Sequence, residues 1–195
     1  MRYILASASP RRQELLALVL DGPFEIQVSD ADESTALSDP AELVQELAKR
    51  KAQAVAKGQE DAVIFGADTV VALEGQILGK PRDRQQAKAM LERLSGKTHT
   101  VYTGIALLHT QSGRMICEAD STQVTFAPMR PEEIEAYLNT GEYADKAGAY
   151  GIQGGAAKHI EKIDGCYFNV MGLPVHRTYE LLKQLMEEVS GKQCR

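Results

Sequence analysis

The sequence predicts an α/β protein with a mixed sheet, because strand and helix patterns follow one another in mixed order along its 195 residues. Short runs rich in Val, Ile and Ala, bounded by turn residues, are typical of buried strands. Between them lie stretches whose apolar residues recur with helical spacing. No internal repeat or low-complexity linker interrupts this order. We therefore expect a single domain over residues 1–195.

Start and stop signals support each element in turn. Ser9-Pro10, Asp39-Pro40, Asp83 and Pro131 are suited to begin helices, because Ser and Asp cap N-termini and Pro suits the first helical position. Glycine-containing turns separate neighbouring strands. The expected strands lie at residues 2–6, 24–29, 62–73, 76–78, 98–109, 115–127 and 158–163. The expected helices lie at residues 10–20, 40–57, 83–94, 131–138 and 174–189.

Composition excludes several classes of protein. The net charge is −5 and no basic block offsets it, which argues against a general nucleic-acid binder. No run approaches the ~18 apolar residues of a membrane span, and the N-terminus lacks the order of a signal peptide. The three cysteines, Cys117, Cys166 and Cys194, are odd in number and far apart, which fits a reducing compartment. We expect a cytoplasmic protein without a nucleic-acid or membrane partner.

The first twelve residues contain a candidate phosphate site. After the apolar run, Ala6-Ser7-Ala8-Ser9-Pro10-Arg11-Arg12 places two hydroxyls and two guanidiniums at the start of a helix. Hydroxyls, backbone N–H groups and guanidiniums at a helix N-terminus are what a phosphate needs. The alternative is a well-capped surface helix whose arginines are solvated.

Asp68 breaks the apolar run of the strand at 62–73. A carboxylate buried on a strand is costly unless a cation, a metal or hydrogen bonds compensate it. At the border of a cleft it would be a candidate base or metal ligand. The alternative is a carboxylate tied to local backbone N–H groups.

Lys51 breaks the pattern of the long helix. Leu43, Leu47 and Val55 form one stripe at steps of four, and Lys51 completes that series on the apolar face. Its neighbour Arg50 lies elsewhere and can be a plain solvated charge. Lys51 either snorkels to solvent or points its ammonium into a cleft at the edge of the core.

Three further positions are weaker candidates when each is taken alone. Lys80, between a glycine and a proline, suits a phosphate contact on a constrained loop, although taken alone an exposed turn lysine explains it better. Glu33, beside Asp32, gains meaning as a metal ligand only if Asp68 is near. Gln153 lies in a segment rich in glycine and alanine and offers both a donor and an acceptor to a base edge. The alternative for that segment is a flexible loop.

Other chemistries find no support in the sequence. The four histidines have no metal spacing, and no Ser/His/Asp or cysteine nucleophile arrangement is present. The segment Ser95-Gly96-Lys97-Thr98 lacks the first glycine of a phosphate-binding P-loop, because the residue five before Gly96 is Leu91.

Taken together and in order, the motifs resemble the Maf family of nucleoside triphosphate pyrophosphatases. The resemblance covers nearly the whole chain. Its motifs are Ala6 to Arg12, Ala48 to Ala52, Gly66 to Thr69, Gly79 to Pro81, Leu94 to His99, Asp145 to Gly154 and Val170 to Pro174.

This resemblance implies an elongated two-lobed α/β fold like that of the inosine triphosphatase (Ham1) group, with an active-site cleft between the lobes. It implies hydrolysis of a nucleoside triphosphate between its α and β phosphates, giving the monophosphate and pyrophosphate, with a divalent cation (Mg²⁺, Mn²⁺ or Co²⁺). The family also suggests a homodimer.

The resemblance also implies roles for single residues. Asp68 matches the general base, and Glu33 with Asp68 would hold the metal. The other catalytic or phosphate-binding matches are Ser7, Arg12, Glu33, Lys51 and Lys80, and the Ser9 hydroxyl is a further phosphate-binding candidate from the N-terminal loop. Arg11, Thr69 and Gln153 match the dTTP/UTP branch at the three positions that separate it from the 7-methyl-GTP branch.

Two alternatives remain open at this point. One is a nucleotide-binding regulator of cell division or septum formation that has no significant turnover. The other is an enzyme that acts on 7-methyl-GTP or on modified pyrimidine nucleotides.

Overall fold

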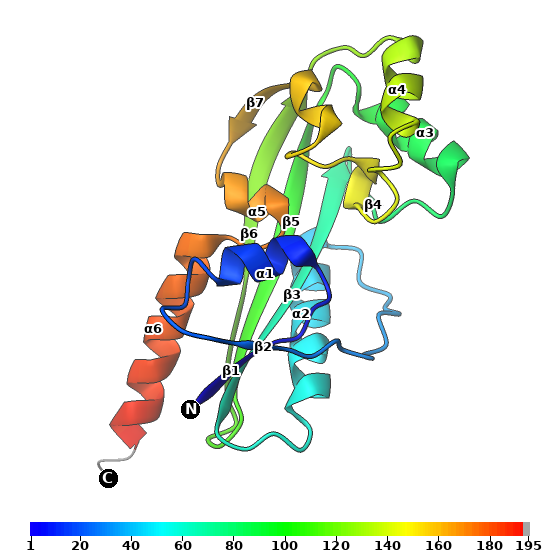
Figure 1. The fold of residues 1–195 in the computed structure, drawn as a ribbon. Coiled ribbons are helices and arrows are strands. Elements are labelled where there is room, and N and C mark those ends of the chain that lie inside the picture. The colour runs from blue at the N-terminus through cyan, green and yellow to red at the C-terminus, as the bar shows by residue number, and fades with distance from the viewer. Residues whose placement is uncertain (193–195) are drawn as a thin grey trace. The chain divides into compact units, whose positions relative to one another are not determined.

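The computed structural model describes residues 1–192, and residues 193–195, including Cys194, lie outside the described part. Strands and helices follow one another in the mixed order that the sequence predicts (Figure 1). The strands are β1 (Arg2–Leu5), β2 (Glu25–Ile26), β3 (Ala62–Leu73), β4 (Gln76–Leu78), β5 (Thr98–His109), β6 (Arg114–Phe126) and β7 (Ile160–Asp164). The helices are α1 (Pro10–Leu16), α2 (Pro40–Ala56), α3 (Arg84–Leu94), α4 (Pro131–Leu138), α5 (Tyr167–Met171) and α6 (Val175–Lys192). Two short 3₁₀ helices span Ala147–Ala149 and Gly155–His159.

The seven described strands form one mixed sheet. Its order is β2-β1-β3-β5-β6-β7, and β4 pairs with β3 off this path. β1 is parallel to β2 and to β3, whereas the β3–β4 and β6–β7 pairs are antiparallel. The predicted fold class is therefore confirmed.

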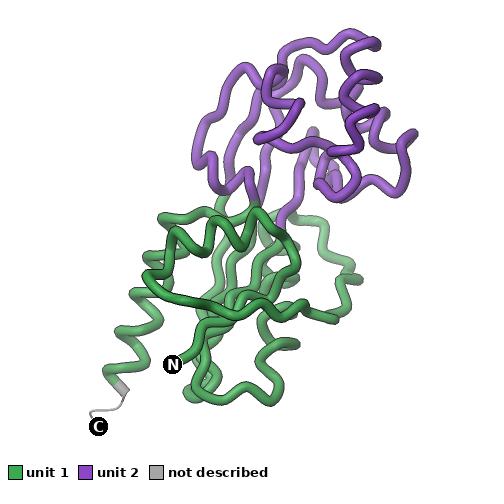
Figure 2. The backbone as a smooth tube through the Cα atoms, in the orientation of Figure 1, with its two compact units in different colours: residues 1–68, 103–120, 172–195 green, residues 69–102, 121–171 purple. Residues whose placement is uncertain are grey.

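The chain divides into two compact units (Figure 2). Unit 1 contains residues 1–68, 103–120 and 172–195, and unit 2 contains residues 69–102 and 121–171. β3, β5 and β6 contribute residues to both units. The expectation of one domain over 1–195 stays a prediction.

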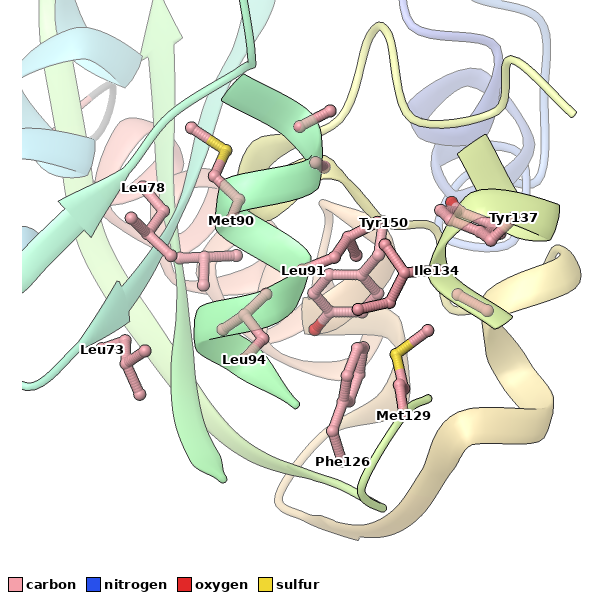
Figure 3. Packing of buried hydrophobic residues seen from close by; sticks show 14 of the residues in the cluster. Leu73, Leu78, Met90, Leu91, Leu94, Phe126, Met129, Ile134, Tyr137 and Tyr150 are labelled. Atoms are coloured by element: carbon pink, nitrogen blue, oxygen red, sulfur yellow. The ribbon is translucent and has the colours of Figure 1, made fainter. Parts of the chain in front are cut away.

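Each unit has a hydrophobic core. In unit 1, small residues of α2 such as Ala48 and Ala52 pack with Ile4 of β1 and Ile64 of β3. In unit 2, residues of α3 and α4 surround aromatic side chains, as Figure 3 shows. The labelled members of this core are Leu73, Leu78, Met90, Leu91, Leu94, Phe126, Met129, Ile134, Tyr137 and Tyr150.

Two N-terminal elements are shorter than the sequence predicts. The helix expected at 10–20 ends at Leu16, because the amides of Leu18 and Val19 bond three residues back and tighten the chain into turns. The strand expected at 24–29 pairs only at Glu25–Ile26, and both residues are exposed. The alternation of apolar and polar residues thus predicts a longer strand than the one that forms, because the faces of this strand are not covered.

The C-terminal third contains two further corrections. The strand expected at 158–163 is Ile160–Asp164, because a 3₁₀ helix occupies the residues before it. The short helix α5 was not predicted, since five residues are too few for helical periodicity to be recognised.

Candidate functional site

In unit 1, helix α2 lies directly on strand β3. A Cβ atom added at Gly66 would overlap the carbonyl oxygen of Ala48 and lie 3.0 Å from the amide nitrogen of Ala52. Side chains alternate along a strand, so Asp68 is on the same face as Gly66 and is directed towards α2. Lys51 lies between Ala48 and Ala52 on the same side of the helix, which brings Lys51 and Asp68 together.

Lys51 joins two carboxylates. Its Nζ atom donates to Oδ1 of Asp68 at 2.6 Å and lies 2.9 Å from Oε1 of Glu33. The side chains of Lys51 and Asp68 are only 13% and 12% exposed, whereas that of Glu33 is 61% exposed. Lys51 therefore does not snorkel to solvent, and Asp68 is compensated by a cation. Lys51 thus binds one mostly buried carboxylate, Asp68, and one exposed carboxylate, Glu33, so three charged groups are concentrated at this position.

The loop that carries Glu33 is held by Arg50. Nη1 of Arg50 donates to the carbonyl oxygens of Asp32 and Ser34, at 3.2 and 2.8 Å, while its Nε donates to Glu46 at 2.8 Å. Arg50 thus binds the backbone on both sides of Glu33. The interpretation of Arg50 as a plain solvated charge is wrong, because its fork of donors meets carbonyls that no helix or strand satisfies.

The N-terminal loop adopts the predicted cap. The Ser9 hydroxyl accepts from the amide of Arg12 at 3.5 Å, and Pro10 begins α1. The Ser7 hydroxyl accepts from the amide of Ser9 at 3.2 Å and from Nη1 of Arg12 at 3.4 Å. These hydrogen bonds hold the loop in a folded turn. Arg11, the second residue of α1, is half-buried. With only seven residues, α1 contributes little of the dipole that the longer predicted helix would have.

Arg12 links this loop to the C-terminal part of unit 1. Its Nε donates to the carbonyl oxygen of Gly172 at 2.9 Å. Burial lowers the pKa of the Arg12 guanidinium, and the nearby charges of Asp68 and Glu33 oppose that shift. The guanidinium therefore belongs to the same local electrostatic network as the Lys51 cluster.

Unit 2 contains Thr69, Lys80 and Gln153. Thr69 is half-buried in β3, whereas the side chains of Lys80 and Gln153 are exposed. Each exposed residue adjoins a buried one, Pro81 beside Lys80 and Ile152 beside Gln153. The backbone that presents both side chains is therefore packed.

The segments that carry Lys80 and Gln153 are joined within unit 2. The amide of Gly148 donates to the carbonyl oxygen of Gly79 at 3.1 Å. Gly148 has a φ of 68°, and a Cβ there would lie 2.9 Å from Val71, so this position requires glycine. The loop after Glu142 is packed onto the core, with Ala149, Tyr150 and Ile152 buried, so the alternative of a flexible loop is wrong.

Tyr150 lies at the base of that loop within an aromatic cluster (Figure 3). Its hydroxyl is 2.8 Å from Nε2 of His99, and its ring meets Phe126 edge to face at 4.8 Å. Burial raises the pKa of Tyr150 and lowers the pKa of His99 to about 4, so both are neutral near pH 7.

The structure thus brings together, within unit 1, the predicted residues Ser7, Ser9, Arg12, Glu33, Lys51 and Asp68. Within unit 2 it joins the Lys80 and Gln153 segments. Sequence reasoning did not assign Arg50, since a basic residue on a helix carries no signal of loop binding.

Within residues 1–192, no cluster of three or more His, Cys, Asp or Glu residues could hold a metal. No helix in this part is both long and apolar enough to cross a membrane.

Comparison with known proteins identifies the family. The family model for Maf-like proteins matches residues 2–185. The chain belongs to the Maf family. A relative from Symbiobacterium thermophilum, named dTTP/UTP pyrophosphatase, is 52% identical over 94% of this chain and 93% of its own length. Relatives with the same name from Clostridium novyi and Moorella thermoacetica are 51% and 50% identical, over 93% and 98% of this chain and 96% and 98% of their own lengths.

A solved structure supports the fold of this Maf protein. A HAM1 protein from Coxiella burnetii superposes with a TM-score of 0.54 over 94% of this chain and 99% of that one, at 15% identity. At that identity the likeness shows the fold alone, and it agrees with the Ham1-like α/β fold that the motifs imply.

Proposed function

We propose that this chain is a nucleoside triphosphate pyrophosphatase that hydrolyses dTTP and UTP to the monophosphate and pyrophosphate. The observation that carries the proposal is the similarity to relatives of that name, at 50–52% identity over at least 93% of both chains. The Lys51–Asp68–Glu33 cluster supports it, since phosphoryl transfer requires positive charge and a proton acceptor in one place.

In this proposal Asp68 is the general base. A water molecule attacks the α-phosphorus, its proton passes to Asp68, and the bond between the α-phosphorus and the bridging oxygen breaks. Pyrophosphate leaves with that oxygen. Lys51 is bound to Asp68 and is placed to neutralise charge that develops on phosphoryl oxygens.

The donor set of the cluster fits a divalent cation. Oxygens of Asp68 and Glu33 both lie within 3 Å of Lys51 Nζ, at 2.6 and 2.9 Å, so this position stabilises positive charge. Mg²⁺ and Mn²⁺ accept one or two carboxylates and complete their coordination with water and substrate phosphates. We assign Asp68 and Glu33 to hold such a cation, which when bound neutralises charge on the phosphates.

The remaining roles are proposed from the family motifs and each residue's setting. Arg12 and the Ser7 and Ser9 hydroxyls are assigned to phosphate binding, as is Lys80 in unit 2. Arg11, Thr69 and Gln153 are assigned to selection of the base. Gln153 is exposed at the end of a packed loop, which suits a side chain that meets a ligand.

The test is a substrate panel of dTTP, UTP, CTP, GTP and 7-methyl-GTP with Mg²⁺, Mn²⁺, Co²⁺ or EDTA. We expect dTTP and UTP to give the monophosphate and pyrophosphate, and EDTA to abolish turnover. In ¹⁸O-labelled water the label should enter the monophosphate, because water attacks the α-phosphorus.

Three other results would change the proposal. Label in pyrophosphate would place the attack on the β-phosphorus. Preference for 7-methyl-GTP would assign the other branch. Binding without turnover would favour a regulatory protein.

A further inference from the structure

Gln153 lies on a tight turn in unit 2. The amide of Gly154 donates to the carbonyl oxygen of Gly151 at 3.2 Å, which closes a four-residue turn with Gln153 at its third position. Ile152 is buried and Gln153 is exposed. The direction of the Gln153 amide therefore depends on what holds the turn.

Two side chains from outside the turn bind its first residue and the residue that follows it. The Tyr137 hydroxyl accepts from the amide of Gly151 at 3.2 Å, and Oε2 of Glu142 accepts from the amide of Gly155 at 2.8 Å. One hydrogen bond thus lies before Gln153 and the other after it. Tyr137 is 3% exposed in the core of unit 2, so the first contact is attached to a rigid support.

The Glu142 carboxylate approaches the backbone closely at a glycine of the turn. A Cβ atom at Gly154 would overlap the Glu142 carboxylate, and its distance from Cδ of Glu142 would be 2.8 Å. A Cβ at Gly155 would make only an ordinary van der Waals contact with the ring of Tyr137, at 3.5 Å. Gly154 is therefore the position that leaves room for the carboxylate to reach the backbone.

Lys146 holds the segment that carries Glu142. Its Nζ donates to the carbonyl oxygen of Glu142 and to Oδ1 of Asp145. A Cβ at Gly151 would lie 2.6 Å from Cε of Lys146, so the lysine stem packs against the start of the turn. Glu142 is thus fixed at its backbone as well as at its carboxylate.

We propose that Tyr137 and Glu142 are positioning residues for base selection, which they exert by fixing the turn that carries Gln153. This inference rests on the proposed function, in which Gln153 recognises the base. A side chain that reads a base edge needs its geometry fixed to within a fraction of an ångström, and supporting hydrogen bonds supply that precision. Neither residue was assigned a role by the sequence motifs.

The test compares kcat/KM for dTTP with kcat/KM for GTP, because this ratio reports base selection. In Glu142→Ala and in Tyr137→Phe we expect the ratio to fall roughly 10- to 100-fold, since misplacement by about 1 Å can cost two orders of magnitude. Glu142→Gln keeps an acceptor for the Gly155 amide and should retain most of the ratio. Glu161→Ala, an exposed residue of β7 in the same unit, is the matched control and should change nothing.

A double variant separates positioning from general damage. If Glu142 acts through Gln153, Glu142→Ala should lower the ratio no further in a Gln153→Ala background. An equal fractional decrease of kcat/KM for dTTP and for GTP in Glu142→Ala and Tyr137→Phe would overturn the inference, because it would indicate only a structural role.

The control on Gln153 distinguishes this failure from failure of the proposed function. If Gln153→Ala lowers the ratio but neither Glu142→Ala nor Tyr137→Phe does, the inference is wrong and the assignment of Gln153 to base selection stands. If Gln153→Ala leaves the ratio unchanged, the base assignment itself is wrong, and the inference falls with it.

Discussion

Replacement of Lys51 by methionine tests the cluster at the centre of unit 1. Methionine fits the apolar stripe of α2 and is a good helix former. It cannot replace the charge that lies 2.6 Å from Asp68, however. The variant leaves a carboxylate that is only 12% exposed without its cation, so it should be less stable despite the favourable side chain.

The magnitude follows from burial. Removal of one partner of a fully buried pair costs about 3–5 kcal/mol. The side chains of Lys51 and Asp68 retain 13% and 12% of their exposure. We therefore expect the free energy of unfolding to fall by about 2–4 kcal/mol near pH 7, or roughly 4–16 °C in Tm for a chain of this size.

The assay is urea unfolding followed by circular dichroism at pH 7. Lys51→Met combined with Asp68→Leu should recover most of the loss, since it removes the unpaired charge as well. Lys57→Met, at the exposed end of the same helix, is the matched control.

Two results would refute this reasoning. One is a Lys51→Met variant as stable as the parent chain, which would mean that Asp68 does not depend on the lysine. The other is a double variant no more stable than Lys51→Met alone, which would locate the loss in packing.

Two further predictions concern other parts of the chain. Arg50→Gln should release the loop that carries Glu33 and lower kcat/KM for dTTP about 10-fold. Arg50→Lys keeps the charge without the planar fork, so its kcat/KM should lie between those of Arg50→Gln and the parent chain. Unchanged kcat/KM in both variants would show that the loop needs no such support. Burial lowers the pKa of His99 to about 4 from the ordinary 6.5, so the unfolded chain binds a proton that the folded chain does not. The contribution of neutral His99 to the free energy of unfolding is fully present above about pH 6.5. It is lost as the pH falls towards 4, and the free energy of unfolding decreases by up to about 3 kcal/mol. His99→Gln, whose amide can still bond the Tyr150 hydroxyl, should flatten the unfolding profile over that range, and a profile parallel to that of the parent chain would contradict the assignment.

The pair at the centre of the site was predictable because each member breaks a pattern. Asp68 interrupts an apolar strand, and Lys51 occupies a stripe of leucine and valine. The continuous apolar run of the strand and the helical spacing of the stripe place both at buried positions, which is enough to expect that each needs a partner. That they are each other's partner depends on the register of α2 on β3, which Gly66 permits and no periodicity indicates.

The supporting residues could not be predicted in this way. Arg50 is a charged residue on a helix, and its carbonyl partners lie on an irregular loop that has no sequence signal. Tyr137 and Glu142 bond amides 14 and 13 residues further along the chain, through a path of turns and 3₁₀ helices. Such contacts depend on the three-dimensional course of a loop, which local patterns do not determine.

The most direct test of the account is the rate of pyrophosphate release from dTTP by Asp68→Asn. Asparagine keeps the size of the side chain but cannot accept the proton from water, so turnover should fall by about 10²- to 10⁴-fold while the protein stays folded. Asp61→Asn makes the same change at an exposed residue of unit 1 and should keep the parent rate. An Asp68→Asn protein that releases pyrophosphate at nearly the parent rate would contradict the assignment of Asp68 as the general base.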